Sequence, residues 1–237
     1  MRKQHGFTLV EIAIVLVIIG LLLGGILRGQ ELIQNARVRN IIDQQNGIKA
    51  AFFGFQDRFR MIPGDLTATQ VAQVGSGVIA AGTPGNGAID PTDSALAFQN
   101  ITVTGFISCQ TCTAAAAAAS TTANSPVNVY GGALQLATDT VYSAPGAGFS
   151  GGGSARHNIK TGNLIPSNVL AEADVKVDDA VPNNGQFRFS IWGAAGSAAP
   201  AGATCTTGNA IGNFWATGAA GAANPVDPNC GAATLIN

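Results

Sequence analysis

Hydrophobic residues form one long segment near the start of the chain. From Phe7 to Leu27 the only charged residue is Glu11. These 21 residues would span roughly 31 Å as a helix rising about 1.5 Å per residue, enough for the hydrocarbon core of a bilayer. The pattern therefore predicts a membrane-spanning helix over 7–27.

A second helical pattern follows the apolar segment. Beyond Arg28 the chain becomes polar, and apolar residues recur at helical spacing, with Gln45 interrupting the stripe. Pro63-Gly64 ends the pattern, so we expect one helix from 7 to about 60, of roughly 80 Å if unbroken. The stripe contains Ile41, Ile48, Phe52, Phe55, Phe59 and Ile62.

Four glycines within ten residues interrupt the apolar half of this helix, at Gly20, Gly24, Gly25 and Gly29. Small residues at this spacing favour close packing of membrane helices. Each glycine also weakens a helix by roughly 1 kcal/mol relative to alanine. The sequence is compatible both with close packing of this segment against other helices and with local melting of the helix.

The remainder, from residue 63, reads as short strands and long loops. Strand-like patterns occupy 128–137 and 186–192, and Asn183-Asn184-Gly185 predicts a hairpin turn before the second. A short helix is expected from 165 to about 173, with Pro166 in its first turn. The stretch 150–154 is interpreted as a flexible loop.

Composition narrows the function classes. The 237 residues carry a formal net charge of −1, and only four of the twelve basic residues lie beyond position 60. The sequence lacks the basic stripe that would suggest nucleic-acid binding. It also lacks a phosphate loop, a dinucleotide fingerprint and a metal-ligand helix, any of which would suggest an enzyme. Four cysteines allow two disulfides and favour an oxidising compartment.

Glu11 needs an explanation, because a charge at membrane depth costs roughly 3 kcal/mol. Cleavage after Gly6 would give Phe7 a free α-amino group with a pKa of about 8, positive at neutral pH. Glu11 lies four residues further on, one helical turn away, or could reach the amine of a neighbouring copy. A secretory signal peptide would need a shorter apolar run and a small-residue cleavage site, and a plain anchor leaves Glu11 unexplained.

The N-terminal sequence RKQHGFTLVE resembles the class III leader of type IV pilins and type II secretion pseudopilins. The resemblance implies that a membrane prepilin peptidase cleaves after Gly6 and N-methylates Phe7. It also implies that Glu11 neutralises the Phe7 amine of an adjacent subunit during assembly. The segments RFRMIPGD (58–65) and EADVKVDDAVPNNG (172–185) resemble pilin-head motifs, although Ala180 replaces a usual glycine, which argues against a left-handed turn there.

The resemblance implies an α+β fold of the type IV pilin kind, in which a long N-terminal helix packs on an antiparallel sheet with long loops. The expected parts are a leader peptide (1–6), a transmembrane and filament-core helix (7–27), the amphipathic second half of the helix (28–62) and a globular head (63–237). The segments 71–101 and 113–126 are interpreted as insertions on that fold.

By the same resemblance we expect a non-enzymatic structural subunit, a major pilin that forms a homopolymer. A minor pilin or a type II secretion pseudopilin is the alternative, and a plain membrane-anchored extracytoplasmic protein is a remote one. The implied partners are the prepilin peptidase, the inner-membrane assembly machinery with its ATPase, and minor pilins. The implied locations are the inner membrane for the precursor and an extracellular filament, or a periplasmic pseudopilus, after assembly.

Two further sets of residues are candidate sites. Cys109 and Cys112 form a CxxC that lacks the histidine of a haem motif and the context of a redox dithiol, so a local disulfide is the simplest interpretation. Cys205 and Cys230 would then close a C-terminal loop of the kind many type IV pilins have, although four cysteines allow three connectivities. No cofactor is expected other than a candidate calcium ion, with carboxylate ligands as the resemblance implies from the C-terminal loop of major pseudopilins. The competing interpretation is a solvated cap or Asx-turn. The calcium candidates are Asp174, Asp178 and Asp179.

Overall fold

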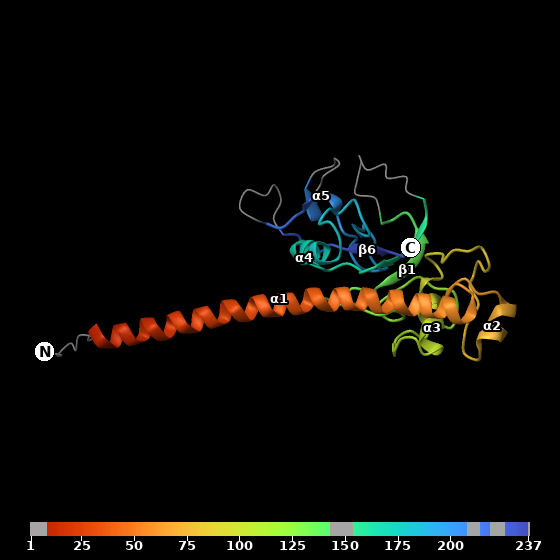
Figure 1. Cartoon of the computed structure of the whole chain (residues 1–237), viewed down its shortest axis with the longest axis horizontal. Coiled ribbons are helices and arrows are strands. Elements are labelled where there is room, and N and C mark those ends of the chain that lie inside the picture. The colour runs from red at the N-terminus through yellow and green to blue at the C-terminus, as the bar shows by residue number, and fades with distance from the viewer. Residues whose placement is uncertain (1–8, 143–153, 208–213, 219–225, 237) are drawn as a thin grey trace. The chain divides into compact units, whose positions relative to one another are not determined.

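The structure is a computed structural model that describes residues 9–142, 154–207, 214–218 and 226–236. The chain divides into two compact units, Met1–Arg37 and Val38–Asn237. Figure 1 shows the elements in chain order. Each unit is described separately below.

The first helix, α1 (Leu9–Phe59), contributes residues to both units. It is helical throughout, including the glycines between positions 20 and 29. It ends one residue before Arg60, which adopts a positive φ of 57° ahead of Pro63. The sequence prediction of one long helix ending near position 60 is confirmed.

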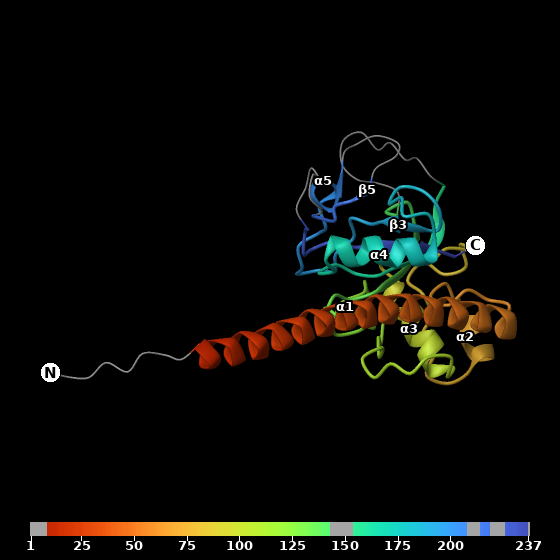
Figure 2. The ribbon, with the colours of Figure 1, turned by 60° about the vertical axis from the view of Figure 1, so that its left-hand side comes forward.

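The larger unit is built on an antiparallel sheet (Figure 2). Its strand order is β1-β2-β6-β3, so the C-terminal strand lies between β2 and β3. The strands are β1 (Gln135–Asp139), β2 (Arg156–Lys160), β3 (Phe187–Phe189) and β6 (Ala232–Leu235). A second pair joins β4 (Thr206–Thr207) to β5 (Phe214–Trp215). The expected α+β fold, a long helix followed by a small antiparallel sheet, is confirmed.

Four shorter helices accompany the sheet. They are α2 (Ala68–Val74), α3 (Ser94–Val103), α4 (Ser167–Val177) and α5 (Gly202–Cys205). Pro166 stands directly before α4, as predicted, but α4 continues to Val177 instead of ending near 173.

Several sequence predictions for the sheet were incomplete or wrong. The predicted hairpin at 183–185 is a turn, but β3 pairs with β6 and not with a sequence neighbour. Helix α4 precedes this turn, so the chain has no adjacent strand to pair with there. Strand β1 begins at Gln135, near the end of the predicted 128–137 segment. Strands β2 and β6 were not predicted.

The segment 71–101, which the sequence analysis interprets as an insertion on the fold, contributes residues to the core. Ile89, Phe98 and Ile101 are completely buried in one cluster with Phe52 and Phe55 of α1. Removing this segment would expose the aromatic residues of α1, which explains why it is retained in the core.

Two buried carboxylates hold the long loop between α2 and α3. Asp65, in the RFRMIPGD motif, accepts hydrogen bonds from the backbone N–H groups of Gly85 (2.6 Å), Asn86 and Gly87 (2.8 Å). Asp93 accepts one from Gly82 N at 2.9 Å. A carboxylate that accepts several hydrogen bonds can satisfy the backbone N–H groups of a loop that has no helix or strand to pair them.

The part of α1 from Val38 onward buries the predicted apolar stripe. Val38 and Ile41 pack with Phe187, Phe189 and Trp215, whereas the more C-terminal residues join the cluster around Phe98. Gln45 is also buried, at 3% exposure, between these two sections of the helix. Among the described residues, neither its amide nitrogen nor its amide oxygen has a hydrogen-bond partner.

We expect Gln45→Met to raise the free energy of unfolding by about 1–2 kcal/mol, because it removes two unsatisfied polar atoms at similar volume. Denaturant unfolding of the full chain in detergent measures the change. Gln44→Met, at a neighbouring position where the side chain donates to Val127 O at 2.9 Å, is the control and should not stabilise. A loss of stability for Gln45→Met would contradict the assignment.

Candidate functional site

The first candidate site is the N-terminal segment. Gly6 and Phe7 lie outside the described residues. Glu11 lies in the first turn of α1, and its side chain is exposed. A carboxylate at this position interacts favourably with the positive end of the helix dipole.

The apolar face of α1 in the first unit is uncovered by its own chain. The large side chains from Leu9 to Leu27 are exposed, Leu21 at 75% and Leu22 at 60% among them. Of the described helices, α1 alone is long and apolar enough to cross a membrane. Burying one such side chain is worth about 1.5–3 kcal/mol, so lipid or other helices must cover this surface.

The glycines of this segment leave open space on the helix surface. A Cβ built on Gly20, Gly24, Gly25 or Gly29 would meet no atom within 4 Å. No contact with another described residue therefore requires glycine there. Close approach of another helix is a physical reason for the small residues.

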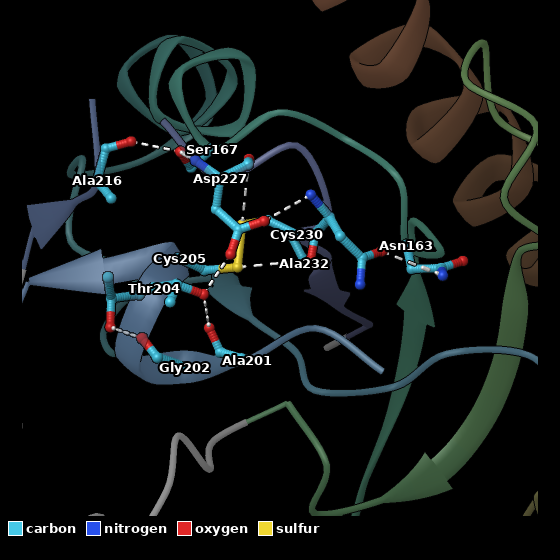
Figure 3. The surroundings of a disulfide bond; sticks show 12 residues. Asn163, Ser167, Ala201, Gly202, Thr204, Cys205, Ala216, Asp227, Cys230 and Ala232 are labelled. Atoms are coloured by element: carbon cyan, nitrogen blue, oxygen red, sulfur yellow. Dashed lines mark hydrogen bonds between the residues drawn. A yellow bond between two sulfur atoms is a disulfide. The ribbon is translucent and has the colours of Figure 1, made fainter. Parts of the chain in front are cut away.

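The second feature is the pair of disulfides. Cys205 at the end of α5 is bonded to Cys230 just before β6, with a Cα–Cα distance of 5.7 Å (Figure 3). Both residues are completely buried. Beside them Asp227 accepts from Asn229 N at 2.7 Å and from the Thr204 hydroxyl, which fixes the loop that returns to the sheet.

The second disulfide joins Cys109 to Cys112 in the loop that follows α3. No helix begins at Cys109, so the CxxC lacks the helix N-terminus that activates a redox dithiol. A zinc site at the CxxC would need further ligands, and His157 is the one histidine that follows the leader. His157 lies on β2, with its ring 5.5 Å from that of Phe52. Among the described residues no metal-ligand group includes the CxxC. Its bond is the local pairing that the sequence analysis favoured.

The third feature is the acidic cluster at the end of α4. Asp174, Asp178 and Asp179 each offer a carboxylate oxygen, and these oxygens lie within 4.8 Å of one another. Asp174 is completely buried and accepts a hydrogen bond from the Trp215 indole N–H at 2.7 Å. Its other oxygen, Oδ1, has no hydrogen-bond partner among the described residues. Sequence reasoning missed Trp215, although a buried indole N–H usually requires an acceptor.

Asp178 and Asp179 organise the turn from α4 to β3. Asp178 accepts from the backbone N–H groups of Gln186 and Phe187, and Asp179 accepts from Val181 N at 2.9 Å. Between them and β3, Ala180 has a φ of +65°. The expectation that alanine would prevent a left-handed turn at 180 is wrong: these hydrogen bonds outweigh a steric cost of about 1–2 kcal/mol.

Burial raises the pKa of Asp174 to about 6. The hydrogen bond from Trp215 opposes this shift, and the charges of Asp179 and Asp178 add to it. Asp174 therefore carries a negative charge at neutral pH in surroundings that penalise it.

The cluster fits the donor chemistry of calcium. Calcium prefers carboxylate and carbonyl oxygens, and the cluster supplies three carboxylates. The buried Oδ1 of Asp174, for which the described residues supply no donor in hydrogen-bond geometry, is the atom best suited to a cation. The alternative Asx-turn role is also present in Asp179, so the two interpretations are compatible.

We expect stability to depend on the ionisation of Asp174 when divalent ions are chelated. The pKa of Asp174 is raised from 3.8 in the unfolded chain to about 6 in the folded chain, so the folded state favours the protonated carboxyl group. The contribution of Asp174 to the free energy of unfolding is therefore complete below pH 3.8 and is lost as the pH rises through about 6. Asp174→Asn should therefore gain stability over the wild type across this range, by up to about 3 kcal/mol at neutral pH. Thermal unfolding at several pH values measures the difference. Asp43→Asn, at an exposed position on α1, is the control, and equal slopes for wild type and Asp174→Asn would contradict the assignment.

The comparisons with known proteins agree with the geometry of the N-terminal segment. Residues 1–27 match the model of the prokaryotic N-terminal methylation motif. No curated protein and no solved structure matches the chain. The motif and the apolar helix that follows it fit an inner-membrane-anchored precursor that is later exported in a filament. On this evidence the N-terminal segment of the chain is a class III leader of the type IV pilin and pseudopilin kind.

Proposed function

We propose that this chain is the major structural subunit of a type IV pilus. The prepilin peptidase cleaves it after Gly6 and methylates Phe7, and the mature subunit joins a helical filament through α1. The observation that carries the proposal is the methylation motif at residues 1–27, followed by a helix whose large apolar side chains are exposed.

Assembly exchanges one apolar environment for another. In the membrane the exposed side chains of the first unit contact lipid, and in the filament they contact the same segment of other subunits. Because the two environments are similarly apolar, this exchange alone fixes neither the direction of assembly nor the position of one helix along the next. A carboxylate at Glu11 and a positive amine at Phe7 of the neighbour supply both, because opposite charges stabilise each other strongly in apolar surroundings and only at one relative position of the two helices.

Glu11→Gln should leave cleavage and methylation unchanged and reduce the yield of sheared filaments at least tenfold, since it removes the charge at nearly constant size. The matched control is Glu31→Gln. Glu31 is also on α1 but pairs with Arg28 at 2.8 Å outside the apolar segment. Mass spectrometry of membranes and immunoblots of sheared fractions give the two readouts. Normal filaments from Glu11→Gln would contradict the assembly mechanism.

A minor pilin or a type II secretion pseudopilin of the same family is the second candidate. The methylation motif is common to the whole family and so favours none of its members. The assembly mechanism through Glu11 and Phe7 applies equally to a pseudopilus. Abundance in surface filaments distinguishes a major subunit from the others.

We also propose that Asp174, Asp178 and Asp179 hold a calcium ion that stabilises the head. The support is the closeness of three carboxylates, whose oxygens lie within 4.8 Å of one another, and the buried Oδ1 of Asp174, which has no hydrogen-bond partner among the described residues. A bound cation would favour the ionised form of Asp174 and so lower its pKa.

With calcium at millimolar concentration, the contribution of Asp174 to the free energy of unfolding should increase with pH instead of decreasing. The wild type should then have a higher melting temperature than Asp174→Asn at pH 7. With chelator the order should be the opposite. Magnesium at the same concentration is the ionic-strength control. Melting curves that calcium and chelator leave unchanged would contradict the calcium site without affecting the assembly mechanism.

A further inference from the structure

A lysine is buried in the sheet of the larger unit, which is an unusual position for a charge. Lys160, the last residue of β2, has 0% exposure and pairs in register with Gln135 of β1. Ile159 joins the cluster that contains Phe52 of α1, so Lys160 points to the opposite face of the sheet. Ala233, its partner on β6, packs there with Tyr142 and Leu235.

The lysine amine contacts an amide and a carboxylate at the same time. Lys160 Nζ donates to Gln135 Oε1 at 2.8 Å and to Asp139 Oδ2 at 2.5 Å. The other oxygen of Asp139 accepts from Asn158 Nδ2 and from Val141 N, each at 3.0 Å. Asp139 is therefore fixed in orientation, with one oxygen directed at the amine.

The surroundings favour a neutral amine more than water does. Burial lowers the pKa of Lys160, and the charge and hydrogen bond of Asp139 oppose that shift. Transfer of the proton from Nζ to Asp139 leaves two neutral groups in a dry site, which avoids the desolvation cost of a buried ion pair. A neutral lysine amine is a nucleophile.

We propose that Lys160 and Gln135 become joined by an intramolecular isopeptide bond. Once Nζ has given its first proton to Asp139, the lone pair of Nζ attacks Cδ of Gln135. The Asp139 carboxylic acid gives a proton to Nε2 and takes up the second proton that Nζ loses, so Asp139 is still protonated after the step. The Cδ–Nε2 bond breaks, and ammonia leaves. One Nζ–Cδ bond forms, one Cδ–Nε2 bond breaks, and no oxidant or other reactant is required.

The geometry supplies what this uncatalysed reaction lacks in water. The amine and the amide carbonyl are held in contact by the β1–β2 register, which gives the reaction a high effective concentration. The carboxylate that moves the proton is already in place, with its side chain 13% exposed, while the lysine side chain is 1% exposed. The product links two adjacent strands covalently, and this would slow unfolding of the head wherever the chain is located.

Peptide mass spectrometry of the full-length wild-type chain tests the proposal. We expect intact chains lighter by one ammonia, no tryptic cleavage at Lys160, and a branched peptide that contains Gln135 and Lys160. Locating the loss matters, because cyclisation at the Asn-Gly steps (such as Asn184-Gly185) also releases ammonia. Wild-type chains in which trypsin cleaves after Lys160, or an ammonia loss located at another residue, would overturn the proposal and leave Lys160 and Asp139 as a simple ion pair.

Two variants check the assigned roles. Asp139→Asn keeps the shape of the site but removes the proton acceptor, so it should restore the ammonia mass and tryptic cleavage. Lys160→Arg keeps a cation without a primary amine and should also have the full mass. A branched Gln135–Lys160 peptide in Asp139→Asn would contradict the role of the carboxylate. The wild-type measurement decides the bond itself even if neither variant folds.

Discussion

The constraint on which the rest depends is an apolar helix surface with one negative charge near its start. Its large side chains are exposed within the chain, and together they represent far more hydrophobic free energy than a single carboxylate opposes. That surface must be covered by lipid before assembly and by other helices afterwards. In the assembly that we propose, Glu11 adds little to the affinity of either state, but it would favour one docked position of a neighbour, because the cleaved Phe7 of that neighbour carries a positive amine.

The head solves a different problem, since a charge-poor chain has to specify one arrangement of long loops. It does so with buried polar groups: Asp65 and Asp93 hold loops by backbone hydrogen bonds, and Asp178 orders the turn into β3. The disulfide at Cys230 fixes the approach to the central strand β6. Lys160 and Asp174 are buried charges of a different kind, because simple packing does not require them, and for that reason we assign chemistry to both.

The sequence was most informative where periodicity and motif agreed. The extent of α1, the position of its apolar stripe and the leader motif could all be predicted. Strand β2 could not, because the buried Lys160 makes Arg156–Lys160 read as a polar segment. The left-handed turn at Ala180 depends on hydrogen bonds from residues on both sides, which no local propensity reveals. The acidic candidates were found from the motif at 172–185 and the ligand chemistry of calcium, but their partner Trp215 comes from 41 residues further along the chain.

The central claim is that cleavage after Gly6 creates a mature subunit that enters a surface filament. Intact-protein mass spectrometry of filaments sheared from native cells, with the membrane fraction alongside, tests it most directly. The account predicts that the dominant sheared species begins at N-methylated Phe7. The same processed species confined to membranes would favour a minor pilin or pseudopilin. Chains that retain Met1–Gly6 in both fractions would contradict the account.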